Sequence, residues 1–353
     1  MGKNKLLIFK SGLLGDTLVS LPALNLIRNN YPNSEIIYLW MKLPNSDYVT
    51  PPEILAQSGL VDRFLYITNY DSIIKRYSSY LKVWFILYFQ KIEIGIVLEP
   101  PYWSAFRKTF LLFCGIKKVI GPNSEINIIE RDIDGDICKS ENVADMLMAQ
   151  LSDLDIDIPE KGCGEFKLHL NNSEKNKSKN FLINNQLSSK ILIGVAPVSN
   201  MPSKCWPIEN YYSVLKELIK EFNIEPIMFG SKKDFINNQK LVSRLEKGFN
   251  VSGEVNVREG IALLSHCKLY LGNDTGTMHM AAAAGIKCVA IFSSIDMPGK
   301  WYPYGTGHKV FRTKIECEGC LLKECIENKS KCITSINYKD VYNACKMILN
   351  ESL

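Results

Sequence analysis

Two glycine-bearing loops, far apart in the chain, carry residue types that suit acid–base and anion-binding chemistry. The first loop, residues 11–16, follows a short apolar run and ends in Asp16. Here Gly12 and Gly15 would let the backbone approach a substrate closely, and Asp16 would act as a general base. The alternative is that Asp16 caps the helix expected to begin at Thr17, a contribution of roughly 1 kcal/mol.

The second loop, residues 272–279, has the character of an anion-binding site. Thr275 and Gly276 precede a run of small residues, and free N–H groups at a helix start, together with the helix dipole, favour a phosphate. Asp274 would repel a phosphate, so we expect it to accept hydrogen bonds from sugar hydroxyls. The alternative is a capping Asp274 and a buried, hydrogen-bonded His279.

A third candidate is Lys204, which stands just before a predicted helix start at Trp206-Pro207. On a loop that leaves the carboxyl end of a strand, its ammonium would neutralise a diphosphate; the alternative is an ordinary solvent-exposed lysine. Lys204 and the helix start near Thr275 would together stabilise a departing diphosphate. We therefore expect catalysis to require no metal cofactor.

Four of the 11 cysteines gather near the C-terminus, at a spacing that suits metal ligands. They are Cys317, Cys320, Cys325 and Cys332. Four thiolates spaced in this way would hold zinc or iron in a closed structural site. The alternatives are reduced thiols in an irregular loop or adventitious disulfides.

Alternating strand-like and helix-like runs predict an α/β fold with parallel sheets. In the first half we expect strands at 5–9, 35–39, 92–98 and 118–121, and a helix at 17–30. In the second half we expect strands at 191–196, 224–229, 268–271 and 288–292, helices at 257–266, 277–284 and 338–349, and an irregular tail after Trp301.

The stretch 171–190 is rich in Asn, Lys and Ser and is the expected domain boundary. The predicted domains are residues 1–175, residues 176–335 with the cysteine-rich loop 317–332, and a closing helix within 336–353. Because α/β folds place ligands at the carboxyl ends of parallel strands, two such loops in two halves predict a cleft between two domains.

Composition and charge are those of a globular protein: 353 residues, 46% hydrophobic, 22% charged and a net charge of +5. The mild positive charge permits an anionic ligand or membrane surface, and we expect no nucleic-acid partner. The N-terminal apolar run is too short for a signal peptide and no run is long enough to span a bilayer, so we expect a cytoplasmic protein.

Residues 77–118 mix aromatic residues with lysine and arginine. Two interpretations stay open. The stretch is either a core helix with solvated charges, or a surface that faces the membrane or the acceptor and attracts anionic lipid or a phosphorylated sugar core.

Four motifs, in this order, resemble glycosyltransferase family 9, the bacterial heptosyltransferases. They are residues 15–24, residues 204–207, residues 274–279, and Asp296 with residues 301–303. Their order and separations match the family over nearly the whole chain. The chain departs from the family pattern at Cys205, where a basic residue is usual, and at Thr277, where proline or leucine is commoner.

The resemblance implies a GT-B fold, in which two Rossmann-like domains with parallel sheets face each other across a cleft. It implies inverting transfer of heptose from an ADP-heptose donor to the lipopolysaccharide or lipooligosaccharide inner core. The acceptor is then a lipid-linked core oligosaccharide, and the enzyme is peripheral to the inner face of the cytoplasmic membrane.

The resemblance also implies roles for individual residues. Asp16 matches the family's proposed catalytic base and Lys204 its diphosphate contact. Ser199 lies where a phosphate-binding hydroxyl is expected. The donor-site loop of the family matches Asp274, Thr275, Gly276 and His279. The related autotransporter heptosyltransferases carry similar cysteines, which are associated with iron.

Two other function classes remain open. One is a different nucleotide-sugar enzyme of the same fold, either a transferase with another sugar or a protein acceptor, or a sugar-nucleotide epimerase. The other is a metal-cluster interaction module in which the cysteine loop recruits a partner. Selective stabilisation by ADP in a thermal shift assay would favour the heptosyltransferase, because a ligand that binds only the native state stabilises it.

Overall fold

Short apolar runs form the central strands of two parallel sheets. In the computed structural model, which describes residues 4–44, 48–99, 104–122 and 129–352, the runs 6–9 and 192–196 are buried throughout. Strands of this kind are apolar on both faces because helices cover both sides of a parallel sheet. The chain divides into unit 1, residues 1–128 and 143–169, and unit 2, residues 129–142 and 170–353.

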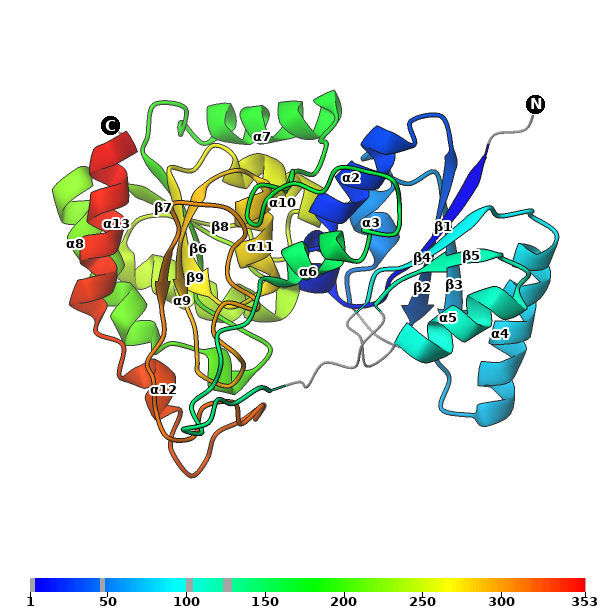
Figure 1. Cartoon of the computed structure of the whole chain (residues 1–353). Helices are drawn as coiled ribbons and strands as arrows, with labels where there is room; N and C mark the ends of the chain where they lie inside the picture. Colours follow the sequence, from blue (N-terminus) through cyan, green and yellow to red (C-terminus); the bar gives the residue numbers. More distant parts are fainter. Residues whose placement is uncertain (1–3, 45–47, 100–103, 123–128, 353) are drawn as a thin grey trace. The chain divides into compact units, whose positions relative to one another are not determined.

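Unit 1 contains a five-stranded sheet of order β3-β2-β1-β4-β5, with every neighbouring pair parallel (Figure 1). Its strands are β1 (Lys5–Phe9), β2 (Glu35–Lys42), β3 (Arg63–Thr68), β4 (Ile94–Val97) and β5 (Lys118–Ile120). Its helices are α1 (Leu14–Leu18), α2 (Leu21–Asn30), α3 (Pro51–Leu55), α4 (Ile73–Tyr88), α5 (Ser104–Phe113) and α6 (Val143–Ala149).

The predicted helix over residues 17–30 is wrong, because the structure has two helices there. Pro22 has no N–H to donate to the carbonyl of Leu18, so it interrupts the backbone hydrogen bonds that a single continuous helix would need. Instead α1 ends at Leu18 and α2 begins at Leu21, with Ser20 as its N-cap. Asp16 therefore lies inside the first turn of α1 rather than before a helix.

Unit 2 contains a six-stranded sheet of order β11-β10-β9-β6-β7-β8, again with parallel neighbours. Its strands are β6 (Leu192–Ala196), β7 (Glu225–Met228), β8 (Phe249–Asn250), β9 (Leu269–Asn273), β10 (Lys287–Ile291) and β11 (Lys309–Phe311). Its helices are α7 (Asn172–Asn184), α8 (Ile208–Phe222), α9 (Phe235–Leu245), α10 (Val257–Leu264), α11 (Gly276–Ala283), α12 (Lys331–Thr334) and α13 (Tyr338–Ser352), with 3-10 turns η2 (Pro202–Lys204) and η3 (Lys232–Asp234).

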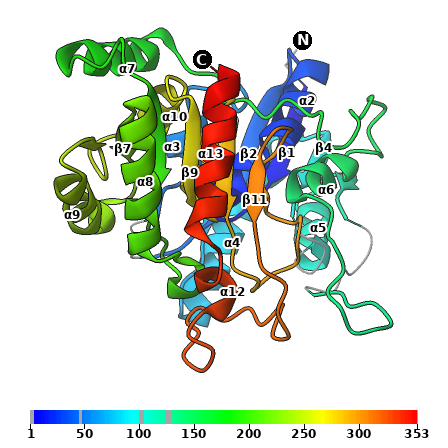
Figure 2. The ribbon, with the colours of Figure 1, turned by 90° about the vertical axis from the view of Figure 1, so that its left-hand side faces the viewer.

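The core of unit 2 lies between its sheet and the pair α8 and α13, which pack side by side (Figure 2). The predicted irregular tail is only partly irregular, because residues 309–311 form β11 and pair with β10, and residues 331–334 form α12. Within the described ranges, no helix has both the length and the apolar character needed to cross a membrane.

The expected boundary segment is a helix that belongs to unit 2. Asn171 caps α7 and accepts a hydrogen bond from the Glu174 backbone N–H at 2.9 Å. The Glu174 carboxylate is buried and pairs with Arg258 of α10, with Oε1 2.5 Å from Nε. This buried ion pair joins α7 to α10, and the division between the units falls after residue 169 rather than after residue 175.

Strand order reverses direction at one point in each sheet. In unit 1 the chain runs outward from β1 through β2 to β3, and then returns to the other side of β1 as β4. In unit 2 the same reversal separates β6 from β9. The carboxyl ends of strands at such a switch point are where doubly wound sheets bind ligands. The predicted loops 11–16 and 272–279 both begin there.

Candidate functional site

Asp16 is held in place by its own loop. Its Oδ2 accepts a hydrogen bond from the Leu13 backbone N–H at 2.9 Å, and the side chain is half-buried. Gly12 has φ +136°, and a Cβ there would lie 2.2 Å from the Asp16 Cβ, so only glycine fits. Gly15 is in the first turn of α1, where its carbonyl accepts from the Val19 N–H at 2.9 Å. Asp16 therefore supports its helix and still lies at the strand ends.

Sequence reasoning missed a group of buried charges beside Asp16. Lys10 directly follows β1, Glu99 follows β4, and both are buried. Glu99 accepts a hydrogen bond from the Ser11 N–H at 2.5 Å and forms an ion pair with Arg107. The signal for Lys10 and Glu99 was present in the sequence, because each stands at the end of an apolar run.

Burial and neighbouring charges act on these cations. Burial lowers the pKa of Lys10; the negative charge of Asp16 opposes that shift and the positive charge of Arg107 adds to it. Burial also lowers the pKa of Arg107 to about 10. The carboxyl end of β1 thus combines a candidate base with buried positive charge, which suits a polar or anionic substrate.

A pocket opens next to Gly12 and Leu13. Its other lining residues are Trp40, Met41, Lys42, Leu43, Tyr48, Val49 and Thr50. The indole Nε1 of Trp40 is buried and forms no hydrogen bond to any other described residue. A buried donor without a partner is costly, and native structures contain few of them.

In unit 2 the structure brings together two of the predicted residues, Lys204 and Asp274. The Nζ of Lys204 lies 2.5 Å from Oδ2 of Asp274, and both side chains are largely buried. Lys204 ends the turn η2 after β6, and Asp274 follows β9, so both stand at the switch point of the sheet. Lys204 is therefore not the solvated lysine of the alternative interpretation.

Asn273, which sequence reasoning did not single out, organises this site. It is fully buried, and its Oδ1 accepts hydrogen bonds from the Trp206 N–H at 3.2 Å and the Tyr211 hydroxyl at 2.8 Å. Its Nδ2 donates to the Pro197 carbonyl at 2.8 Å. One side chain thus joins the end of β9, the end of β6 and the start of α8.

The start of α11 has the form expected of an anion site. Thr275 is its N-cap and Gly276 its first residue, so N–H groups there lack helical partners. The hydroxyl oxygen of Thr275 is buried, and the hydroxyl of Tyr270 lies beside it. His279 is buried one turn later. The free N–H groups at this helix start would favour a phosphate.

Ser199 lies in the loop between β6 and η2. Its Oγ accepts a hydrogen bond from the Met201 N–H at 3.2 Å. Cys205, in the position where the family usually has a basic residue, directs its Sγ to the Ser199 and Met201 carbonyls at 3.6 Å each. Burial raises the pKa of the Cys205 thiol and so favours its neutral form, where the basic residue of the family would carry a positive charge.

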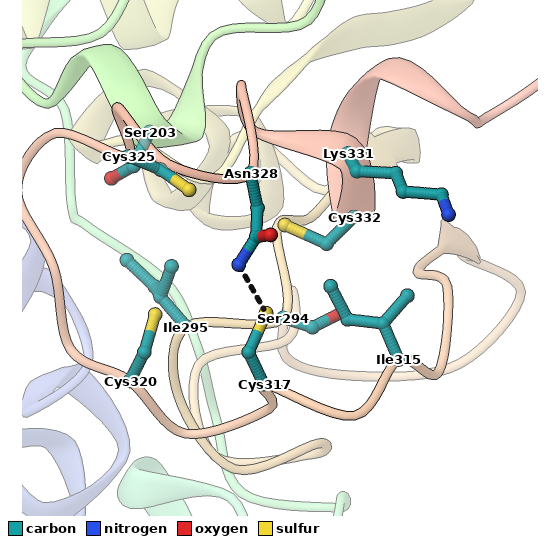
Figure 3. A pocket seen from close by; sticks show the side chains of 10 residues that line it. All are labelled: Ser203, Ser294, Ile295, Ile315, Cys317, Cys320, Cys325, Asn328, Lys331 and Cys332. Atoms are coloured by element: carbon teal, nitrogen blue, oxygen red, sulfur yellow. Dashed lines mark hydrogen bonds between the residues drawn. The ribbon is translucent and has the colours of Figure 1, made fainter.

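The four clustered cysteines line one small cavity (Figure 3). Cys317, Cys320 and Cys325 are half-buried, Cys332 is buried, and none of the four forms a disulfide. Asn328 Nδ2 lies 3.7 Å from Sγ of Cys317. Ser203 also lines the cavity, and its Oγ donates to the Leu322 carbonyl at 2.6 Å. The cysteine loop is thus tied to the turn that carries Lys204.

The donor set suits a thiolate-binding metal, but the atoms are not arranged as a finished coordination site. Within the described residues no group of three or more His, Cys, Asp or Glu side chains has metal-binding geometry. The four sulfur atoms nevertheless point toward the middle of the cavity (Figure 3). Side-chain rotation within the loop would be needed to complete a tetrahedral site.

Comparison with known proteins gives a family match over more than half of the chain. The profile of glycosyltransferase family 9 (heptosyltransferase) matches residues 110–331, which include Lys204 and Asp274 but not Asp16. Lipopolysaccharide heptosyltransferase 2 from Salmonella typhimurium is 32% identical over 111 residues, 30% of this chain and 32% of that protein. This match therefore spans about a third of the length of that curated relative.

Two solved structures share the fold along nearly their full length. A glycosyl transferase family 9 protein from Veillonella parvula has a TM-score of 0.74 and 20% identity, covering 99% of this chain and 98% of that one. The ADP-heptose lipopolysaccharide heptosyltransferase II of Escherichia coli has a TM-score of 0.68 and 20% identity, covering 98% and 99%. The predicted GT-B class with two Rossmann-like units is confirmed.

Proposed function

We propose that this chain, which belongs to glycosyltransferase family 9, transfers heptose from ADP-heptose to the inner core of lipopolysaccharide or lipooligosaccharide. The observation that carries the proposal is the pairing of Lys204 with Asp274 at the switch point of unit 2, inside the residues that match the family. A cation, a sugar-binding carboxylate and a helix start together suit a nucleotide sugar.

The proposed reaction is a direct displacement. The acceptor hydroxyl attacks the anomeric carbon of the donor and gives its proton to Asp16, while the bond from that carbon to the diphosphate oxygen breaks and ADP leaves. Attack opposite to the leaving group inverts the anomeric configuration. A positioned base of this kind contributes typically 10²–10⁴-fold to the rate.

Donor binding would rearrange the ion pair in unit 2. The diphosphate carries more negative charge than Asp274 and would take over the Lys204 ammonium, leaving the Asp274 carboxylate to accept hydrogen bonds from sugar hydroxyls. The start of α11 would bind the phosphate through its free N–H groups. Lys204 and the helix start supply the positive charge that a divalent metal supplies elsewhere.

The acceptor would bind unit 1. Its polar groups near Asp16 are the buried Lys10, the Arg107–Glu99 pair and the pocket beside Gly12 that contains Lys42. Cations of this kind suit a phosphorylated sugar core. We propose that this core is lipid-linked, and that the enzyme works at the inner face of the cytoplasmic membrane.

We further propose a structural zinc or iron in the cysteine cavity. Cys317, Cys320, Cys325 and Cys332 would hold it as thiolates, and it would supply a rigid cross-link for a loop with little secondary structure. Through Ser203 that loop supports the turn that carries Lys204.

A transfer assay with purified full-length chain tests the proposed activity. The donors are ADP-heptose, ADP-glucose and UDP-N-acetylglucosamine, and the acceptor is lipooligosaccharide from a strain that lacks this gene. We expect a mass increase of one heptose with ADP-heptose alone, and a thermal shift with ADP larger than with UDP. Transfer from another nucleotide sugar, or epimerisation of one without transfer, would contradict the proposal.

A further inference from the structure

Helices α4 and α5 lie next to each other on the sheet of unit 1 (Figure 1). The Tyr80 ring of α4 lies 5.1 Å from the Phe110 ring of α5 in an edge-to-face contact. The Trp84 indole Nε1 donates to the Phe113 carbonyl at 3.1 Å. Their inner side chains, including Val83 and Leu87, pack into the core of the unit. The two helices therefore form one continuous layer with an outward face.

That outward face is also apolar. On α4, besides the exposed Ile73 and Ile86, five exposed apolar side chains recur at steps of three and four residues, which places these five on one stripe of the helix. They are Ile74, Tyr77, Leu81, Phe85 and Tyr88. On α5 and just beyond α4 the face continues with Phe89, Phe106, Leu112 and Phe113. Ile74 is 82% exposed, and Leu81 and Phe85 are each 61% exposed. Extended exposed apolar patches mark interaction surfaces.

All the charged residues of α4 and α5 themselves are positive. Neither α4 nor α5 contains an aspartate or glutamate. Arg107 is bound to Glu99, and Lys108 donates to the Gly121 and Pro122 carbonyls at 3.1 Å each. The exposed cations on and beside the two helices are Lys75, Arg76, Lys82, Lys91, Lys117 and Lys118. Among the described residues from 71 to 122, the exposed acidic residues are Asp71 and Glu93.

We propose, building on a lipid-linked acceptor, that the outward face of α4 and α5 docks unit 1 on an anionic lipid bilayer. A helix with apolar residues on its exposed face and lysines along the edge lies in the plane of the headgroups. Tyrosine and tryptophan favour this interfacial layer, and each lysine adds attraction to anionic lipid. A second copy of the chain is a poorer occupant, since a two-fold contact through this face would bring like charges together.

Sedimentation of the full-length chain with vesicles tests the surface. We expect binding to vesicles of phosphatidylglycerol and phosphatidylethanolamine, and much weaker binding to phosphatidylcholine alone. The pair Leu81→Ser and Phe85→Ser removes apolar contacts and should lower the partition coefficient at least about tenfold. The pair Lys75→Gln and Lys82→Gln should lower it by a similar factor and weaken its dependence on salt.

Matched controls come from unit 2. Ile236 on α9 is 68% exposed, a fraction similar to the 61% of Leu81. Lys240 on the same helix is also exposed. Ile236→Ser and Lys240→Gln should leave vesicle binding unchanged. The two double variants of α4 are called the helix variants. Melting temperatures and ADP affinities equal to those of the native chain would show that they are folded.

Three outcomes would overturn the docking surface. They are no binding of the native chain to anionic vesicles, native-like binding by both helix variants, and a concentration-dependent dimer that only the helix variants abolish. Vesicle binding needs no turnover, so failure of the heptose assay with intact vesicle binding would count against the proposed function alone. Conversely, transfer to a delipidated acceptor should persist in the helix variants.

Discussion

The ammonium of Lys204 and the carboxylate of Asp274 are partners, with Nζ 2.5 Å from Oδ2. The sequence predicts separate roles for them, one on a diphosphate and one on a sugar. Their pairing lets each largely buried charge offset the other. Either charge alone would carry an uncompensated desolvation penalty. The pairing also means that the donor diphosphate must compete with Asp274 for the Lys204 ammonium. A substitution at either residue should therefore alter the interactions of the other.

Replacement of Lys204 tests its diphosphate contact. Lys204→Ala should raise the donor KM or lower kcat at least about tenfold, because a charge-assisted contact to phosphate is lost. It should also cost some stability, because Asp274 is left largely buried without its cation. Steady-state kinetics and denaturant titration measure the two effects, with exposed Lys240→Ala as the control. Unchanged donor kinetics would remove Lys204 from the site.

Replacement of Asp16 separates the base from the helix cap. In Asp16→Asn the side-chain oxygen can still accept from the Leu13 N–H, so the melting temperature should barely change. The amide cannot take a proton, so kcat should fall by about 10²-fold or more. ADP affinity should survive. Near-normal turnover, or activity lost only together with stability, would leave the capping role alone.

Asn273 offers a stability test of the unit 2 site. Asn273→Leu leaves the Trp206 N–H, the Tyr211 hydroxyl and the Pro197 carbonyl without their partner. Orphaned buried groups of this kind should lower the free energy of unfolding by about 2–4 kcal/mol. Urea titration measures the change, with the exposed loop residue Asn200→Leu as the control. A difference below about 0.5 kcal/mol between the two variants would show that the three contacts contribute little.

The cysteine loop should hold close to one metal ion per chain. Elemental analysis of protein purified under reducing conditions should find zinc or iron near one equivalent. The double variant Cys317→Ser and Cys320→Ser should lose it, whereas Cys163→Ser, at an exposed isolated cysteine, should retain it. Metal-free protein with four freely titratable thiols in the native state would leave only reduced thiols in a loop.

His308 predicts a pH dependence of stability. Its Nδ1 accepts from the Cys288 N–H at 3.0 Å and its Nε2 lies 3.0 Å from the Tyr304 carbonyl, so the ring is neutral with the proton on Nε2. Burial is the main cause of its lowered pKa. A folded-state pKa below the unfolded value means that the unfolded chain binds the proton more readily, so stability should fall as pH drops below about 6.5.

Urea unfolding at pH 7.5 and pH 5.5 measures this loss. His308→Asn should reduce it, and the exposed loop variant Asn200→Leu, which changes no titratable group, should leave it as in the native chain. Some loss should persist in the His308 variant, because burial also lowers the pKa of His266. An identical loss of unfolding free energy in the native chain and in the His308 variant would show that His308 does not cause the pH dependence.

Much of the fold was predictable from local pattern. The apolar runs at 6–9, 192–196 and 269–271 form central strands because only buried positions tolerate such runs. Predictions failed where one residue overrides a periodic pattern, as Pro22 does in dividing α1 from α2. They also failed where pairing depends on distant chain, as for β11 beside β10 and for α7 beside α10.

The sequence alone determined which residue types follow the strands, and hence that Asp16, Lys204 and Asp274 were candidates for chemistry. Only the tertiary structure decided that Lys204 and Asp274, 70 residues apart, form an ion pair, and that Asn273 joins three elements beneath them. The physical reason is strand order. Local periodicity does not specify which parallel strands become neighbours, and it is the adjacency of β6 and β9 that brings these side chains together.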